Sequence, residues 1–366
     1  MKKAIEFLKK EIVMTVSLVL ALASMFLVPP DAGYGAYIDW DVLMLLFALM
    51  AVVAGFKKCR VFDAVSAWLV KMGGNLRRLS MMLVLACFFV SMVVTNDVAL
   101  ITFVPLTVGM LGGISAGKLI YIVTLETIAA NLGSMATPIG NPQNLYLYSS
   151  YVMSGSEFLG AVLPIAGVSL VLLLAACIPI SREPVSVSAA AQQKMPAGRL
   201  IAYAALLIMC ILSVFHVLPK WVCCIVVAAV VLVLDRKGIL EVDYALLMTF
   251  ACFFVFVGNV GRLESVSNFI SRVVVGRELE AGILASQLIS NVPAALMISG
   301  FTDNGIELMR GVNIGGLGTL VASLASLISF KAYMKAPGAK AGKYIAWFTG
   351  INLAFLAMIY ACSFII

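Results

Sequence analysis

Two carboxylates lie within apolar stretches of the sequence. Asp97 follows Thr95 and Asn96 in the stretch 79–111, and Glu126 precedes Asn131 in the stretch 118–150. A charged side chain at the centre of a bilayer costs roughly 2.5 to 3.5 kcal/mol on insertion scales, so an acid at that depth is a functional candidate. We expect Asp97 and Glu126 to carry a proton or to ligate a cation. The structural alternatives are a helix N-cap for Asp97 and a hydrogen bond from Glu126 to a broken backbone.

Polar residues interrupt two apolar stretches at their middles. Thr95-Asn96-Asp97 lies within 79–111, and Ser290-Asn291 lies within 281–300. Non-helical backbone at membrane depth is tolerated only where it is buried in protein or lines an aqueous cavity, because lipid cannot satisfy a free amide or carbonyl. Each stretch is therefore either a broken span or a re-entrant hairpin that carries its polar residues at the tip.

Glycine and asparagine break two further apolar stretches. The stretch 118–150 contains NLGSMATPIGNPQN at 131–144, and the stretch 304–330 contains NIGGLGT at 313–319. Carbonyl oxygens of unwound backbone suit Na+ or another hard cation, whereas the N-terminus of a helix that returns from a hairpin tip favours an anion. Two of each would form a site for an anion with a coupling cation. The simpler alternative is that Asn and Gly only satisfy bends and allow close helix packing.

The composition requires helices in a membrane to position these groups. Of the 366 residues, 63% are hydrophobic and 12% are charged, whereas soluble domains are near 45 to 50% apolar and about 25% charged. A helical span needs roughly 20 apolar residues, so the chain has room for about ten spans and for no soluble domain. The eight cysteines lack metal-ligand spacing, and we predict no metal site beyond Na+.

The apolar segments predict an all-α integral membrane protein of about nine full spans and two hairpins. The nine spans lie near 12–30, 41–56, 118–150, 155–180, 199–217, 220–235, 243–258, 304–330 and 343–366. With the two interrupted stretches 79–111 and 281–300 taken as hairpins and the N-terminus in the cytoplasm, 20 of the 25 Lys and Arg residues face inside. This asymmetry favours the hairpins over full crossings and places the C-terminus outside the cell, in a multi-pass protein of the inner (plasma) membrane. It also accounts for the net charge of +7 without a nucleic-acid partner.

The interruptions form an internal repeat. Hairpin 79–111 and broken helix 118–150 fall in a first half, 1–180, and hairpin 281–300 and broken helix 304–330 fall in a second half, 181–366. On the topology above, the matching segments 41–56 and 243–258 cross in opposite directions, so the repeats are inverted. Inverted repeats with broken helices in matching positions are typical of secondary transporters whose binding site lies at the midplane of the membrane.

At these motifs the sequence resembles the ion transporter superfamily. Its members include the arsenite permeases, the sodium/proton antiporters of NhaD type, the citrate permeases and the divalent-anion:sodium symporters. The motifs are TNDVAL at 95–100, TPIGNPQN at 137–144, SQLISNVP at 286–293 and NIGG at 313–316. The resemblance covers nearly the whole chain and looks closest to the YbiR-like bacterial permeases. It implies an elevator-type movement of hairpins and broken helices against a scaffold, and a homodimer.

The resemblance also implies roles for individual residues. The divalent-anion symporters carry Ser-Asn-Thr at each hairpin tip, where it binds substrate carboxylate and helps to form a sodium site. By position, Thr95, Asn96, Ser290 and Asn291 would contact the anion or ion, and the residues that would line the cation sites are Asn131, Gly133, Asn313 and Gly315. Asp97 and Val292 stand where that family has Thr, which weakens the case for a dicarboxylate and for two sodium sites. An Asn-Asp tip looks more like the arsenite permeases and favours a proton-coupled step.

Together these features predict a secondary active transporter of a small anion, an oxyanion or a carboxylate, coupled to H+ or Na+. The expected substrate residues are Thr95, Asn96, Asp97, Thr137, Asn144, Ser290, Asn291 and Thr319. The expected coupling residues are Asn96, Asp97, Glu126, Asn131, Gly133, Asn291, Asn313 and Gly315. The alternative within transport is a Na+/H+ antiporter of NhaD type. An enzyme is not expected, because the chain contains no HExxH and no acid in a GxGD setting, and no cofactor is expected beyond the coupling ion.

Overall fold

The chain folds into helices. The computed structural model describes residues 11–72, 74–185 and 197–365, and within these ranges its only β pairing is an isolated bridge between Asn75 and Pro184. The predicted all-α class is therefore confirmed. The basic residues counted above for 1–10 and 186–196 lie outside the described residues.

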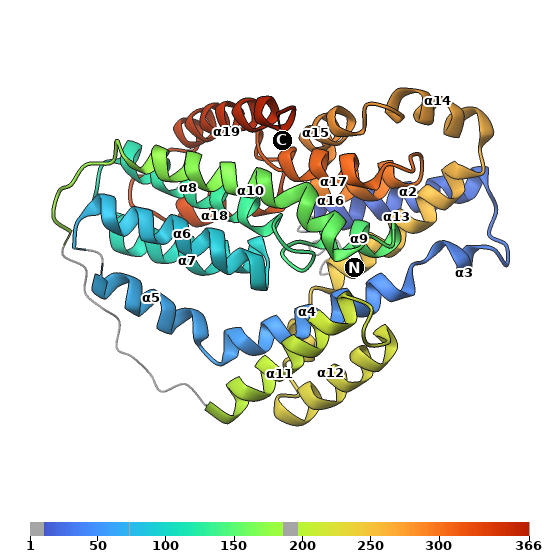
Figure 1. Cartoon of the computed structure of the whole chain (residues 1–366), viewed down its shortest axis with the longest axis horizontal. Coiled ribbons are helices and arrows are strands. Elements are labelled where there is room, and N and C mark those ends of the chain that lie inside the picture. The colour runs from blue at the N-terminus through green and yellow to red at the C-terminus, as the bar shows by residue number, and fades with distance from the viewer. Residues whose placement is uncertain (1–10, 73, 186–196, 366) are drawn as a thin grey trace.

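The same order of elements occurs twice along the chain (Figure 1). After α2 (Ile12–Leu27) and the short α3 (Tyr34–Tyr37), the first series is α4 (Trp40–Lys58), α5 (Val61–Met72), α6 (Leu76–Val94), α7 (Asn96–Leu111), α8 (Ala116–Ser134), α9 (Pro142–Ser150) and α10 (Gly155–Cys177). α11 (Ala197–Val214), α12 (Lys220–Leu234) and the 3-10 turn η1 (Ile239–Glu241) follow. The second series is α13 (Tyr244–Gly261), α14 (Glu264–Val274), α15 (Glu278–Ile289), α16 (Asn291–Ser299), α17 (Gly305–Ile314), α18 (Leu324–Tyr333) and α19 (Ala341–Ser363). Both series open on an Asp N-cap, Asp39 for α4 and Asp243 for α13.

Six helices of the described chain are long and apolar enough to cross a membrane: α4, α6, α10, α11, α13 and α19. The other four predicted spans correspond to shorter apolar helices or to helix pairs. α2 and α12 have 16 and 15 residues. The stretch 118–150 is divided between α8 and α9, and the stretch 304–330 is divided between α17 and α18. The count of nine spans and the inversion of the repeats stay predictions.

Both predicted hairpin stretches are helix pairs joined through a single residue. The first, α6–α7, has arms of 19 and 16 residues, and the second, α15–α16, has arms of 12 and 9 residues. The pairs begin three residues earlier than the apolar stretches indicated, because Asn75 caps α6 and α15 starts directly after Arg277. The first pair is thus much the longer, and α6 has the length of a complete span.

Two helices of more than ten residues lie outside the predicted spans and hairpins. α5 occupies most of the basic segment 57–78, and α14 lies between α13 and the second hairpin. α14 exposes Val266, Phe269 and Val273, whose spacing places them along one side of the helix. Such an amphipathic helix escapes a search for long apolar runs because half of its residues are polar.

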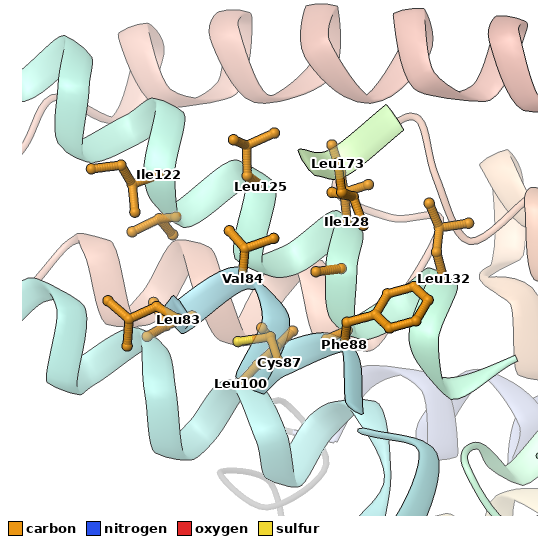
Figure 2. Close-up of a cluster of buried hydrophobic side chains, with 14 of the residues drawn as sticks. Leu83, Val84, Cys87, Phe88, Leu100, Ile122, Leu125, Ile128, Leu132 and Leu173 are labelled. Carbon is orange, nitrogen blue, oxygen red and sulfur yellow. The ribbon is translucent and has the colours of Figure 1, made fainter. Parts of the chain in front are cut away.

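Buried apolar side chains form two cores. The first core comes mainly from α6, α7, α8, α10, α18 and α19, and the second comes mainly from α4, α9, α11, α12, α13, α16 and α17. Figure 2 shows the centre of the first core, where Leu83, Cys87 and Phe88 of α6 face Leu100 of α7 and the α8 row that runs from Ile122 to Leu132. Each broken helix contributes one half to each core, so the unwound segments 135–141 and 315–323 are where the chain passes between them.

Candidate functional site

The hairpin tips have the same backbone geometry. Thr95 has a φ of 118° and Ser290 has a φ of 76°, backbone angles that residues other than glycine rarely adopt. In each case the next residue donates its backbone N–H to the unwound segment of its own half. Asn96 donates to the Gly140 carbonyl at 3.2 Å, and Asn291 donates to the Ala322 carbonyl at 3.0 Å. Strained backbone that is held in this way is characteristic of functional sites, because the surrounding structure must stabilise it.

Asparagines brace each broken helix against the other. Asn131 on α8 accepts hydrogen bonds at Oδ1 from Asn96 and from the Ser323 hydroxyl, both at 3.1 Å, and it donates to the Gly316 carbonyl. Asn313 on α17 accepts from Asn141 at 3.1 Å and donates to Asn144 Oδ1 at 2.6 Å. Each therefore reaches into the unwound segment of the other half.

A side-chain amide also caps the carbonyls of each unwound segment. In the first half, Asn144 Nδ2 donates to the carbonyls of Met135 and Thr137, at 3.1 and 3.2 Å. In the second half, Gln287 on α15 donates to the carbonyls of Gly315 and Leu317, at 2.9 and 2.8 Å.

The two threonines of the unwound segments bind the neighbouring hairpin arms. Thr137 donates to the Met92 carbonyl at 2.5 Å. Thr319 donates through its hydroxyl to the Gln287 carbonyl at 3.4 Å and through its backbone N–H to Gln287 Oε1 at 3.0 Å. Both threonines were expected in a substrate site, and the structure places both in the attachment of a hairpin to a broken helix.

A cavity of about 640 Å³ lies between α4 and the first hairpin tip. One part of its lining contains the polar residues Thr95, Asp97 and Asn141, and another part contains Lys57 and Lys58 near the end of α4. Most of the remaining lining is apolar: Leu46, Leu49, Met50, Val53, Ala54, Val94, Val98, Ile101, Ile139, Pro142, Leu145, Leu246 and Ile328. Glu241 and Asp243 complete the wall.

A second, much smaller cavity joins the two halves. It measures about 30 Å³, and its lining includes Asn96, Asp97, Asn291 and Ser323. Both hairpin tips thus meet around one small space, and Asp97 lines both this space and the larger cavity.

Glu126 lies apart from these cavities. It is fully buried on α8, its Oε1 accepts a hydrogen bond from the Thr107 hydroxyl of α7 at 2.5 Å, and its Oε2 has no hydrogen-bond partner among the described residues. It lines neither cavity. The structure therefore separates the two candidate acids, with Asp97 at the cavity and Glu126 inside the first core.

The two glycines expected at cation sites occupy tight helix contacts. A Cβ on Gly133 would lie 2.1 Å from the Phe88 carbonyl oxygen, and a Cβ on Gly315 would lie 2.8 Å from the Cα of Ile283. Gly133 thus allows α8 to pack against α6, and Gly315 allows α17 to pack against α15. The Gly315 carbonyl belongs to the unwound segment and accepts a hydrogen bond from the Gln287 amide.

The expected residues consequently divide into groups. Thr95, Asn96, Asp97 and Asn291 line the cavities; Asn131, Asn144 and Asn313 form the braces; Ser290 is the second tip. Three contributors were not predicted, namely Asn141, Ser323 and Gln287. Asn141 and Ser323 are the N-caps of α9 and α18. Each stands where the chain returns to a helix after the unwound segment, and this matching position in the two halves could have indicated them from the sequence.

Comparison with known proteins gives consistent matches along the chain. A family model described as citrate transporter matches residues 4–304. The inner membrane protein YbiR of Escherichia coli is 32% identical over 315 residues, which cover 84% of this chain and 83% of YbiR. The silicon efflux transporter LSI3 of rice is 31% identical over 149 residues, or 40% of this chain and 30% of LSI3. The crystal structure of the YdaH transporter of Alcanivorax borkumensis superposes with a TM-score of 0.54 at 13% identity and covers 96% of this chain and 95% of that one, which supports the fold alone.

Proposed function

The chain belongs to the citrate transporter family of multi-pass membrane transporters, and from that membership we propose that it is a secondary active transporter of a small anion, coupled to H+ or Na+. The observation that carries the proposal is the cavity that joins the polar tip of the first hairpin to two lysines at the end of α4. Its volume lies within the range of roughly 300 to 1,000 Å³ that is typical of small-molecule sites.

The lysines favour an anion. Lys58 forms ion pairs with Asp235 and Glu241, whereas Lys57 forms no ion pair with any residue of the described ranges. An unpaired cation on a cavity wall raises the local concentration of anions. Both anion classes enter the test below, because the family model is named for citrate, a carboxylate, and LSI3 is named for silicon efflux.

Asp97 supplies a reason for coupling to a proton. Two unit charges about 4 Å apart repel by about 4 kcal/mol at an effective dielectric constant near 20. An anion that binds beside Thr95 and Asn96 would meet this repulsion from an ionised Asp97, and protonation of Asp97 would remove it. Anion and proton would then bind together, and we assign Asp97 as the proton carrier. Glu126, which is buried and forms no ion pair with any described residue, is the second candidate for a proton carrier.

The division of the chain supports an elevator-type movement. The cavity has α4 on one side and the first hairpin tip on the other, and Figure 1 shows α4, α11 and α12 grouped apart from α6, α7, α8 and α10. We assign α4, α11 and α12 to a scaffold that forms a homodimer, and the hairpins and broken helices to the moving part. With the N-terminus in the cytoplasm, as the positive-inside rule favours, we assign Lys57 and Lys58 to the cytoplasmic side and the C-terminus to the outside.

The alternative of a Na+/H+ antiporter has one observation in its favour. Three of the five charged residues that line the cavity are acidic: Asp97, Glu241 and Asp243. A dye-based assay of proton flux upon addition of sodium, with no substrate anion present, separates the two functions. Proton release on the addition of sodium alone supports the antiporter.

Uptake into proteoliposomes tests the proposal. Silicate, arsenite, phosphate, citrate and succinate are offered under an imposed pH gradient and under an imposed sodium gradient, with protein-free liposomes as the control. We expect one or more of these solutes to accumulate under a gradient, and we expect Asp97→Asn to abolish the accumulation. If neither gradient drives any of them, or if Asp97→Asn leaves accumulation unchanged, the proposed coupling is wrong.

A further inference from the structure

We propose that the side-chain amide of Gln287 occupies a latent cation site in the second unwound segment and thereby excludes Na+ from it. The inference rests on the proposed function, because it concerns the coupling ion of that transporter. Gln287 lies on α15, three residues before the hairpin tip at Ser290.

The contacts fix the orientation of this amide. Its Nε2 donates to the carbonyls of Gly315 and Leu317, at 2.9 and 2.8 Å, and its Oε1 accepts from the backbone N–H of Thr319 at 3.0 Å. A carbonyl only accepts and a backbone N–H only donates, so the opposite orientation would lose all three hydrogen bonds. The nitrogen therefore faces the carbonyl oxygens.

The backbone is shaped around the amide. Gly318 has a φ of 110°, and a Cβ at that position would lie 2.2 Å from Gln287 Oε1. Only glycine fits there, both because of the left-handed backbone and because of the contact. The segment 315–319 thus encloses the Gln287 side chain on several sides, as it would enclose a ligand.

The position is suited to a cation. α17 ends at Ile314, so the negative end of its dipole points at the same space as the carbonyls of Gly315 and Leu317. Unwound carbonyls and the C-terminal ends of half-helices are the groups that coordinate Na+ in transporters with broken helices. The Gln287 amide satisfies these oxygens with two N–H bonds and brings no net charge, so the oxygens are not left to a metal ion.

The first half reaches the same result by another route. Met92 holds the corresponding position three residues before the tip Thr95, and its side chain has no hydrogen-bond donor. There Asn144 of α9 donates to the carbonyls of Met135 and Thr137. Since amides cap both unwound segments, the carboxyl of Asp97 is left as the charge-carrying group at the tips.

Two substitutions uncover the site. Gln287→Glu keeps the length of the side chain and replaces the donor nitrogen by a carboxylate oxygen, which together with the Gly315 and Leu317 carbonyls forms an oxygen shell for Na+. Gln287→Ala removes the amide and leaves the carbonyls open. The matched control is Asn259→Asp, the same amide-to-acid change at a buried residue of α13 that contacts Ser24 and lies outside both unwound segments.

The readout is the thermal unfolding of the purified full chain in sodium chloride and in choline chloride of equal ionic strength. Binding of Na+ to the folded state raises the apparent melting temperature. We expect no sodium-specific rise for the wild type or for Asn259→Asp, a clear rise for Gln287→Glu and a smaller one for Gln287→Ala. Should Gln287→Glu fail to fold, Gln287→Ala and the wild type still decide the question.

Several results would overturn the inference. They are a sodium-specific rise in the wild type, the same rise in Asn259→Asp as in Gln287→Glu, and the absence of any rise in both Gln287 variants. Because unfolding is measured without substrate, it remains decisive if no solute is transported. In proteoliposomes, uptake by the wild type that is driven by a sodium gradient at equal pH would also contradict it, whereas uptake driven by a pH gradient in sodium-free buffer agrees with it.

Discussion

The two halves of the chain share a framework and differ in charge. In both, the asparagine after the hairpin tip is tied to the unwound segment, and the asparagine that precedes the break reaches the N-cap residue of the opposite broken helix. The four residues are Asn96, Asn291, Asn131 and Asn313. The halves differ at the two positions that carry a buried or cavity-lining acid in the first half. Asp97 of the first tip corresponds to Val292 of the second, and Glu126 of α8 corresponds to Leu308 of α17.

This difference separates what both halves contribute from what only one contributes. A framework repeated in both halves provides two tips that meet at one small cavity, and of the two tips only the first carries an acid, Asp97, while Asp243 at the start of α13 also lines that cavity. The side-chain amides that bind the carbonyls of the unwound segments also differ in origin. In the first half the amide comes from α9, and in the second half it comes from α15. Geometry is thus common to the halves, whereas the proposed coupling group, Asp97, belongs to the first.

The largest effect is expected from removing this asymmetry of charge. Asp97→Asn makes both tips uncharged, so the repulsion of about 4 kcal/mol between Asp97 and a neighbouring anion disappears. Substrate should then bind at high pH as well as at low pH, while accumulation driven by a pH gradient is lost. Uptake and substrate binding measured across pH check both parts.

Asp243→Asn serves as the control for Asp97→Asn. Asp243 lines the same large cavity, and Asn can still cap α13 as Asp243 does through the N–H of Leu246. Uptake by the Asp243→Asn variant should still be driven by the pH gradient. If both variants lose coupling equally, the special place of the first tip is refuted.

A large effect on folding is expected from Gly133, just before the first break, and Gly315, at the start of the second. Gly133→Ala places a Cβ 2.1 Å from a backbone oxygen of Phe88, and Gly315→Ala places one 2.8 Å from Ile283 Cα. Overpacking costs about 1 to 3 kcal/mol and more where backbone must move. We expect both variants to unfold at lower temperature, and Gly133→Ala to be the worse. Gly109→Ala, which meets no atom within 4 Å, is the control, and an equal loss there would contradict the packing argument.

A moderate and equal effect is expected from the braces. Asn131→Ala and Asn313→Ala each leave buried partners without a hydrogen bond, at a cost of about 1 to 3 kcal/mol. Thermal unfolding should show similar losses for the two. Asn352→Ala removes a single bond to the Phe348 carbonyl and should cost less. A loss confined to one brace would mean that the framework is not shared.

The smallest effect is expected at the mouth of the cavity. Lys57 has Gly261 as its counterpart at the end of α13, so the two halves differ in charge at this position. Lys57→Ala should raise the KM for anion uptake by about two- to fivefold, since one exposed charge contributes about 0 to 1 kcal/mol. High salt should reduce the effect. Lys58→Ala, whose lysine is already paired with Asp235, should change KM less, and the reverse order would exclude Lys57 as the anion-attracting residue.

Much of the framework could be predicted from the sequence. Polar residues at the middle of apolar runs are conspicuous because lipid tolerates so few of them, and this located both tips and both breaks to within a few residues. The amphipathic helices α5 and α14 could not be found in this way, since their pattern resembles that of ordinary connecting segments.

Composition and position along the chain are enough to conclude that this is a helical membrane protein with polar interruptions and two acids within apolar stretches. Which of the two acids faces the cavity depends on how the helices pack. The rotation of α8 about its axis turns Glu126 toward Thr107 in the first core, while the tip at Thr95 exposes Asp97. The tertiary structure also places Gln287 on the Gly315 and Leu317 carbonyls. Such contacts join residues up to 45 positions apart in one half, and nearly 200 apart between halves, so they depend on how helices pack.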